Sequence, residues 1–319
     1  MCCLFLAASS TVAIAQTNVV DLVNPIIGTN GMGHTFPGAC VPFGLVQLSP
    51  DTDTIPHNVD GKYQPRSYEY CAGYQHKDSS IVGFSHTHFS GTGHSDLGDI
   101  LIMPTTGTLK LNPGTATNPD GGYRSRFSHD TEISRPGYYE VMLADYGVKA
   151  QLTTTQRAGI HKYTYPTNSE NQRIILDMIH GIYNYDGKVL WTNIRVENDT
   201  LVTGYRITNG WARTNYTYFA MSFSKPITHY GCEEKAKVNY RGGYAKFNMK
   251  ENFPDIGGRK IVAYFDFDPK TSDELEVKVA LSGVSTEGAL KNLRAEASGA
   301  DFDQLAAKAS DTWNKALSV

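Results

Sequence analysis

Short runs of alternating apolar and polar residues constrain this chain most strongly. Between about Tyr123 and Leu281, the runs 139–143, 261–267 and 275–281 place an apolar side chain at every second position. Because successive side chains of a strand point to opposite faces, this period of two predicts half-buried strands. Turn signals such as Asn209-Gly210 separate such runs. The sequence therefore predicts a mostly β fold, an antiparallel β-sandwich.

The pattern changes after Ser285, where two helices are expected. The first covers Glu287 to Ala297 with Ser285 as its N-cap, and the second begins at Asp301, with Gln304 in the capping-box position. Apolar residues of the second helix recur every three or four positions and form one face, comprising Phe302, Leu305, Ala306, Ala309, Trp313 and Leu317.

We interpret residues 285–319 as a C-terminal α-helical linker toward a further domain that this chain lacks. Its apolar face is then expected to be largely exposed or poorly packed, which would promote self-association. The alternative is a helix that folds back on the sandwich.

The N-terminus predicts export. Residues 1–15 contain an apolar stretch that ends in Ala13-Ile14-Ala15, which is typical of a signal peptide with its cleavage site, although the basic start of such peptides is absent. The stretch is too short and too rich in serine and threonine to span a bilayer. We therefore expect a secreted or periplasmic protein whose β-sandwich domain covers residues 16–284.

Charge and cysteine content exclude several classes of protein. The net charge is −3, with 29 Lys and Arg against 32 Asp and Glu, so nothing favours binding to nucleic acid or to an anionic membrane. Without the signal peptide three cysteines remain, Cys40, Cys71 and Cys232. An odd number at wide spacing predicts neither a disulfide framework nor a zinc ribbon, and their pairing stays open.

Two glycine-rich segments are the candidate sites. The first, residues 28–39, contains His34 and Phe36 among closely spaced glycines that allow a close approach of backbone to a ligand. No Lys-Ser/Thr pair follows the glycines, so a phosphate-binding loop is excluded.

The second segment, residues 83–99, is dense in hydrogen-bonding side chains, namely His86, His88, Ser90, Thr92, Asp96 and Asp99. Such side chains suit a polyhydroxylated ligand, because each sugar hydroxyl both donates and accepts a hydrogen bond. Two alternatives stay open. His86, His88 and Asp96 could bind a transition metal, or the aspartates could fix turns while the histidines bond to carbonyls.

These pieces together resemble a known family. Residues 23–29 (VNPIIGT), 36–39 (FPGA), 42–44 (PFG), 83–93 (GFSHTHFSGTG) and 155–163 (TQRAGIHKY) resemble, in this order, the N-terminal domain of glycoside hydrolase family 92. The likeness extends from about Asp21 to the helix of Trp313.

The resemblance implies a calcium-dependent, inverting exo-α-mannosidase that acts on mannose-containing glycans. It also implies a β-sandwich of the supersandwich kind, a helical linker and a C-terminal (α/α)6 barrel, with the active site between the domains. The catalytic acid and base, and most calcium ligands, would belong to the barrel. This chain would then hold no catalytic residue, would be inactive alone and would depend on the missing C-terminal catalytic domain.

On this reading the chain binds α-mannoside glycans through one concave surface formed by both segments and facing the barrel. The residues expected there are His34, Phe36, His86, His88, Ser90, Thr92, Asp96 and Asp99. A self-sufficient carbohydrate-binding module is the alternative, and it predicts a C-terminal helix that packs onto the domain. Metal-dependent hydrolysis centred on His86 and His88 is a third hypothesis, disfavoured because no base accompanies the pair. Linkage specificity, oligomeric state and any metal ligands of this chain stay open.

Overall fold

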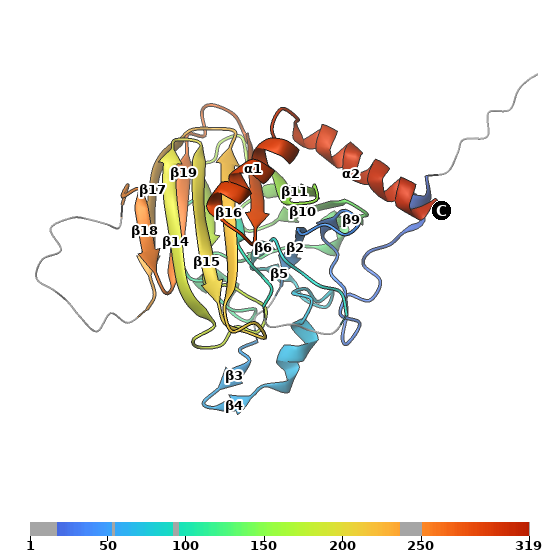
Figure 1. Cartoon of the computed structure of the whole chain (residues 1–319), viewed down its shortest axis with the longest axis horizontal. Coiled ribbons are helices and arrows are strands. Elements are labelled where there is room, and N and C mark those ends of the chain that lie inside the picture. The colour runs from blue at the N-terminus through green and yellow to red at the C-terminus, as the bar shows by residue number, and fades with distance from the viewer. Residues whose placement is uncertain (1–17, 53–54, 92–95, 237–250, 319) are drawn as a thin grey trace, which may run out of the picture.

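The computed structural model describes residues 18–52, 55–91, 96–236 and 251–318. Their architecture is a β-sandwich of two large antiparallel sheets with two helices at the C-terminal end (Figure 1). The predicted fold class is therefore confirmed. Residues 1–15, on which the predicted signal peptide falls, lie outside the described part.

The first sheet has seven strands in the order β1-β2-β6-β7-β13-β19-β17. Their bounds are β1 (Ala39–Cys40), β2 (Gln47–Asp51), β6 (Gly83–Ser85), β7 (Leu101–Thr105), β13 (Gln172–Asp177), β19 (Ile261–Phe267) and β17 (Ile227–Glu234).

The second sheet has nine strands in the order β18-β14-β15-β16-β20-β12-β11-β10-β9. Their bounds are β18 (Asp255–Gly258), β14 (Val189–Asn198), β15 (Leu201–Thr208), β16 (Asn215–Phe223), β20 (Glu274–Ser282), β12 (Ala158–Thr164), β11 (Val148–Thr154), β10 (Tyr138–Leu143) and β9 (Ile133–Arg135).

Smaller elements fill the connections. Two small two-stranded sheets are described: the hairpin of β3 (Asn58–Val59) with β4 (Lys62–Tyr63), and the pair of β5 (Ser80–Ile81) with β8 (Ser125–Arg126). Four 3-10 turns are η1 (Val19–Leu22), η2 (Pro65–Tyr70), η3 (Pro119–Gly121) and η4 (His129–Thr131). The β3–β4 hairpin protrudes from the sandwich (Figure 1).

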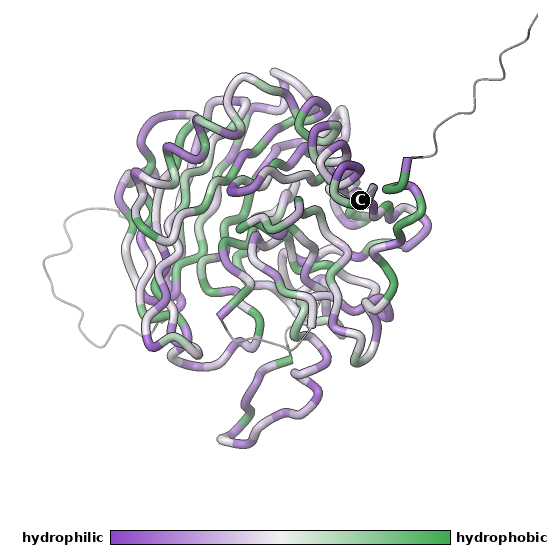
Figure 2. Tube along the Cα trace, turned by 45° about the vertical axis from the view of Figure 1, so that its right-hand side comes forward, coloured by the Kyte–Doolittle hydropathy of each residue, from purple (hydrophilic) through white to green (hydrophobic). Residues whose placement is uncertain are grey.

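The core lies between the two sheets, where the alternating residues meet. Tyr139, Val141 and Leu143 of β10 are buried while the residues between them are partly exposed, as the period of two predicts. The expected half-burial is wrong for β19, whose Val262 and Tyr264 are also buried. Side chains of the neighbouring strands cover this second face, since Arg173 of β13 and His229 of β17 lie against the ring of Tyr264. Figure 2 shows the hydrophobic stretches concentrated within the strand layers.

The two predicted helices are present with the predicted caps. α1 (Thr286–Glu296) begins after Ser285, whose side chain accepts a hydrogen bond from the amide of Gly288. α2 (Phe302–Leu317) begins after Asp301, and both bonds of the capping box with Gln304 are formed. Neither helix of the described part is long and apolar enough to cross a lipid bilayer.

The expected exposure of the apolar α2 face is wrong. Phe302, Leu305 and Ala309 are buried, and the Trp313 indole donates a hydrogen bond to the carbonyl of Cys40 at 2.6 Å. Only the end of the face stays open, where Leu317 is 38% exposed. The helices find their partner within the chain, on small and apolar residues of the outer face of the nine-stranded sheet, namely Ala158, Ile160, Ala220 and Ala280.

Polar contacts fix the helices at both ends. Lys278 of β20 donates to the carbonyls of Ala297 and Ala300, which follow α1. Glu296 forms an ion pair with Arg157 at 2.7 Å. Near the far end of α2, the side-chain carbonyl of Asn314 accepts a hydrogen bond from the amide of Val20, so the two ends of the described chain lie side by side (Figure 1). The domain boundary at residue 284 stays a prediction.

Candidate functional site

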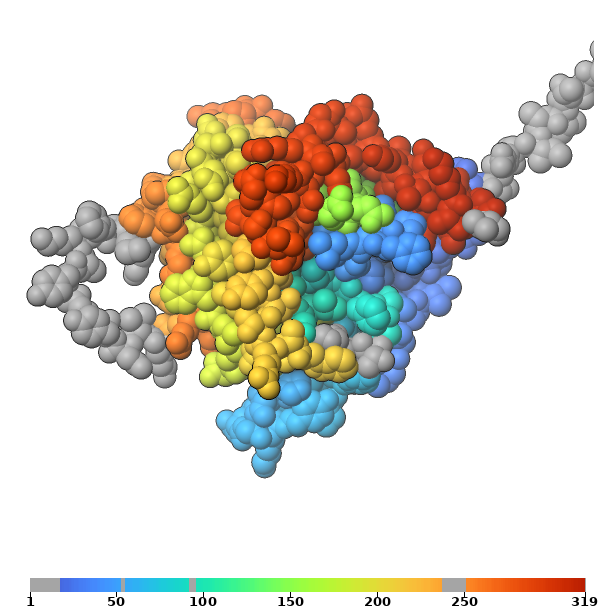
Figure 3. Space-filling view, in the orientation of Figure 1, coloured from blue at the N-terminus to red at the C-terminus, as the bar shows by residue number. Residues whose placement is uncertain are grey.

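A cavity of about 390 Å³ lies where four parts of the sequence meet. The loop before β2, the segment after β6 and the ends of β16 and β20 form its walls, and these blue, turquoise and yellow parts adjoin at the surface (Figure 3). The lining residues are Leu45, Thr87, Phe89, Asp96, Leu97, Asp99, Asn215, Tyr216, Thr217, Leu281, Ser282 and Gly283.

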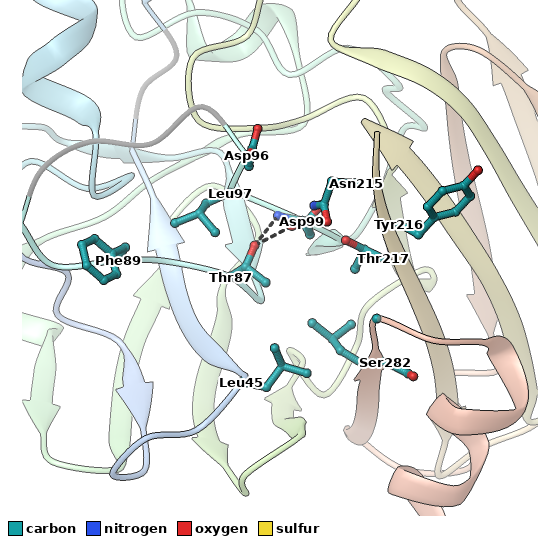
Figure 4. Close-up of a pocket in the computed structure, with 12 residues that line it drawn as sticks. Leu45, Thr87, Phe89, Asp96, Leu97, Asp99, Asn215, Tyr216, Thr217 and Ser282 are labelled. Atoms are coloured by element: carbon teal, nitrogen blue, oxygen red, sulfur yellow. Dashed lines mark hydrogen bonds between the residues drawn. The ribbon is translucent and has the colours of Figure 1, made fainter. Parts of the chain in front are cut away.

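Asp99 lies at the base of this pocket and is neutralised there. Its Oδ1 is 2.7 Å from a terminal nitrogen of Arg206, and both side chains are buried. Its Oδ2 accepts a hydrogen bond from the hydroxyl of Thr87 at 2.8 Å (Figure 4). Because a buried carboxylate is costly unless it is paired and hydrogen-bonded, the Arg206 guanidinium is what allows Asp99 to occupy this position.

Asp96 closes the upper side of the pocket. Its two carboxylate oxygens accept hydrogen bonds from the amides of Trp211 and Ala212, at 3.0 and 3.2 Å. Asp96 thus holds the turn between β15 and β16 against the segment after β6. This is the turn-fixing role that the sequence left open, now combined with a place in the pocket wall.

The side chain of Lys188 is buried behind the same wall. Its ammonium donates to the carbonyls of Ile182 and Leu97, and it has no exposed surface. Burial, followed by the nearby charge of Arg206, lowers the pKa of Lys188 to about 7. Neither Lys188 nor Arg206 was a candidate from the sequence, because Lys188 lies directly before β14 and Arg206 on β15, both far along the chain and without a local motif.

His86 belongs to a hydrogen-bonded chain inside the sandwich. Its Nδ1 lies 2.6 Å from the carbonyl of Ile100, its Nε2 lies 3.0 Å from Nε2 of His161, and Nδ1 of His161 lies 2.8 Å from the Tyr163 hydroxyl. One set of neutral tautomers satisfies every contact: Tyr163 donates to His161, His161 to His86, and His86 to the carbonyl. Burial lowers the pKa of His86 to about 4 and that of His161 well below its usual value.

His88 is equally enclosed and shares a carboxylate with a second histidine. Asp51 accepts from Nε2 of His88 at 2.9 Å and from Nε2 of His180 at 2.8 Å. Both imidazoles hold the pKa of Asp51 below its usual range, against the opposing effect of burial. Gly73, at φ +83°, makes room for this cluster, because a Cβ there would lie 2.1 Å from Asp51 Oδ1.

The two glycine-rich segments do converge, as expected. The amide of Gly91 donates to the carbonyl of His34 at 2.8 Å, and the ring of Phe36 lies 5.6 Å from that of His88. Gly33 permits the tight loop, because a Cβ there would lie 2.2 Å from the carbonyl oxygen of Gly28.

The expected single concave surface is wrong, however. Asp96 and Asp99 line the large pocket, whereas His34, His86 and His88 are buried. The ring nitrogens of His86 and His88 contact core carbonyls, Asp51 and His161, which leaves them no contact with a ligand. Phe36 and Ser90 line a separate cavity of about 260 Å³ beside Trp313. Thr92 lies outside the described residues. That any of these residues contacts a substrate stays a prediction.

One group of side chains in the described part of the chain has the spacing of metal ligands. It consists of His76, His129 and Glu132, whose ligand atoms all lie within 4.8 Å of one another. Calcium takes six to eight oxygen ligands, so this nitrogen-rich group does not fit it. Asp96 and Asp99 are engaged with amides, a hydroxyl and an arginine. The calcium expected from the resemblance stays a prediction.

Comparison with known proteins gives a consistent answer. Residues 22–282 match the model of the "Glycosyl hydrolase family 92 N-terminal domain". A solved family GH92 α-mannosidase of Bacteroides thetaiotaomicron, in complex with mannoimidazole, superposes with a TM-score of 0.83 at 41% identity, covering 95% of this chain and 37% of that one.

More distant relatives agree. The family GH92 inverting mannosidase of Bacteroides thetaiotaomicron has a TM-score of 0.71 at 26% identity, covering 94% of this chain and 36% of its own. An "Uncharacterized secreted glycosidase" of Arthroderma benhamiae is 25% identical over 98% of this chain and 39% of its own length. The chain thus spans less than two fifths of each of these proteins.

Proposed function

The chain belongs to glycoside hydrolase family 92, as its N-terminal domain, and from this we propose that it forms the sugar-recognising half of an exo-acting α-mannosidase. The observation that carries the proposal is the 41% identity, over 95% of the chain, to an α-mannosidase solved with mannoimidazole. We assign this chain the same substrate class, α-mannosides of mannose-containing glycans.

The large pocket has the chemistry that a neutral sugar requires. Phe89 offers an aromatic ring on one side of the pocket, and Asn215 and Thr217 offer an amide and a hydroxyl on the other side (Figure 4). The described residues that line the pocket include no lysine or arginine. Polar groups of this kind without a cation suit sugar hydroxyls better than a phosphate or carboxylate.

The carboxylates of this pocket are poor candidates for the chemical step. An inverting glycosidase needs a protonated acid and a carboxylate base about 6.5–9.5 Å apart, with a water between them. Asp99 is ion-paired with Arg206, and Asp96 accepts two backbone amides, so each is held as a structural anion. We therefore assign the acid and base, and the calcium that would bind mannose hydroxyls, to a C-terminal domain of the full enzyme.

We propose the stereochemical outcome and the location by analogy with relatives. Inversion of the anomeric centre is proposed by analogy with the inverting Bacteroides mannosidase. Export to the periplasm or medium is proposed from residues 1–15, and the secreted Arthroderma relative supports it.

The test is turnover of an aryl α-mannoside by the purified chain, with and without calcium, and after mixing with the C-terminal domain of the 41% identical Bacteroides enzyme. We expect no turnover by the chain alone and calcium-dependent turnover by the mixture. Turnover by the chain alone that disappears in Asp96→Asn or Asp99→Asn would contradict the proposal.

A self-sufficient carbohydrate-binding module is the second candidate, and the packing of α2 favours it. A helix that covers the sandwich with Phe302, Leu305 and Ala309 is what such a module requires. Titration of the chain alone with mannose and yeast mannan separates the two functions. A self-sufficient module should bind mannan with a saturable heat signal in calorimetry, whereas half of an enzyme pocket should show no saturable binding.

A further inference from the structure

A second candidate site lies outside both cavities, where the turn before β5 meets η4. His76 belongs to that turn, His129 begins η4, and Glu132 follows η4 directly. The two imidazole rings are tilted by 35° with their centroids 3.9 Å apart, and Nδ1 of His129 lies 2.6 Å from a carboxylate oxygen of Glu132. One ligand atom from each residue lies within 4.8 Å of those of the other two.

The carboxylate of Glu132 is fixed in its orientation. The buried hydroxyl of Tyr139 donates to Oε1 at 2.7 Å, and that of Tyr74 donates to the same oxygen at 2.9 Å. Oε2 faces His129. Donors that orient a ligating carboxylate from behind are the usual outer shell of a metal site.

We propose that His76, His129 and Glu132 bind a divalent transition metal of the zinc class. Two imidazoles and one carboxylate form a donor set that zinc takes, at metal–ligand distances of about 2.0–2.2 Å. Atoms already within 4.8 Å need only a small closure to reach that geometry. The His129 side chain is 37% exposed, which leaves access from solvent for the ion and for a water ligand.

The site would join two segments that support the glycine-rich loop. The amide of His76 donates to the carbonyl of Thr29 at 2.9 Å, and the Gln75 side chain bonds to both backbone groups of Gly31. Glu132 in turn connects to β10 through Tyr139. A metal at this point therefore clamps the base of the loop to the nine-stranded sheet, which is a structural role apart from the pocket.

The experiment titrates the tag-free, EDTA-treated chain with Zn²⁺ by calorimetry and with Co²⁺ by visible absorption. We expect one equivalent bound and the d–d absorption of a low-symmetry Co²⁺ site. His129→Gln should weaken binding at least 10-fold, since one of three protein ligands is lost. His229→Gln is the matched control, because His229 is similarly exposed but lies on β17 beside Asp266.

The proposal is overturned if the chain binds no stoichiometric metal, or if His129→Gln and His229→Gln bind it equally. Thermal melts without metal check that both variants fold. A zinc-induced rise in melting temperature should occur in the parent chain and in His229→Gln. It should be absent from His129→Gln, and its persistence there would count against the site even if calorimetry proved ambiguous.

Discussion

Arg206 and Asp99 form a buried ion pair at the base of the large pocket, with a guanidinium nitrogen 2.7 Å from Oδ1. The pair joins β15 to the segment after β6, two parts of the chain that are 107 residues apart. The sequence predicts Asp99 as a ligand contact, whereas in the structure its carboxylate stabilises the base of the pocket through Arg206.

The first prediction concerns this pair. Asp99→Ala should destabilise the chain by about 3–5 kcal/mol, because it leaves a buried guanidinium without its partner. Urea unfolding followed by tryptophan fluorescence measures the change. The double variant Asp99→Ala/Arg206→Met should lose less than the sum of the two single losses. An Asp99→Ala variant as stable as the parent would show that the pair is not closed in solution.

The second prediction concerns acid stability. The folded state holds the pKa of His86 at about 4, whereas an unfolded histidine titrates near 6.5, so the unfolded state binds more protons between these values. Stability should therefore fall as pH decreases from about 6.5 to about 4, by up to about 3 kcal/mol from this residue. Urea midpoints at several pH values measure it.

The control for acid stability is His86→Gln, whose unfolding free energy should depend less on pH over the same range. An equal dependence of the unfolding free energy on pH in the parent chain and in His86→Gln would contradict the prediction. If the variant does not fold, NMR of the parent chain decides instead, because a His86 ring that titrates near 6.5 in the folded state contradicts it as well.

The third prediction concerns α2. Leu305→Ala should cost about 2–5 kcal/mol, as for other buried leucines, because the side chain packs against the outer face of the sheet. Lys308→Ala, on the same helix but at an exposed position, should change stability by less than about 0.5 kcal/mol. Chemical unfolding of both variants tests this. Equal stabilities would restore the sequence-based expectation of a loosely attached linker.

The fourth prediction concerns the pocket. Phe89→Ala removes an exposed ring that lines the cavity, so it should lower mannosidase activity in the reconstituted enzyme about 10-fold without changing the melting temperature. Tyr63→Ala is the matched control, an equally exposed ring on the distant β3–β4 hairpin. Activity that falls equally in both variants would remove Phe89 from the proposed site.

The sequence by itself determined the elements whose signals are local. Alternating residues along β10 and β20 predict strands because a strand turns successive side chains to opposite faces. Asp301 and Gln304 define the start of α2 because a capping box is closed within four residues. The ordered motifs from residue 23 to residue 163 were sufficient to identify the family.

Only the tertiary structure decided which of the polar residues face solvent. His86 and His88 follow a strand in a glycine-rich segment, a pattern equally suited to a ligand site and to a core network. Between them, the two rings contact Ile100, His161, Gln47 and Asp51, which come from other segments of the chain, so no signal within residues 83–99 predicts their burial. The same holds for Arg206 under Asp99 and for the sheet face under α2, because burial is a property of the assembled layers and not of any one segment.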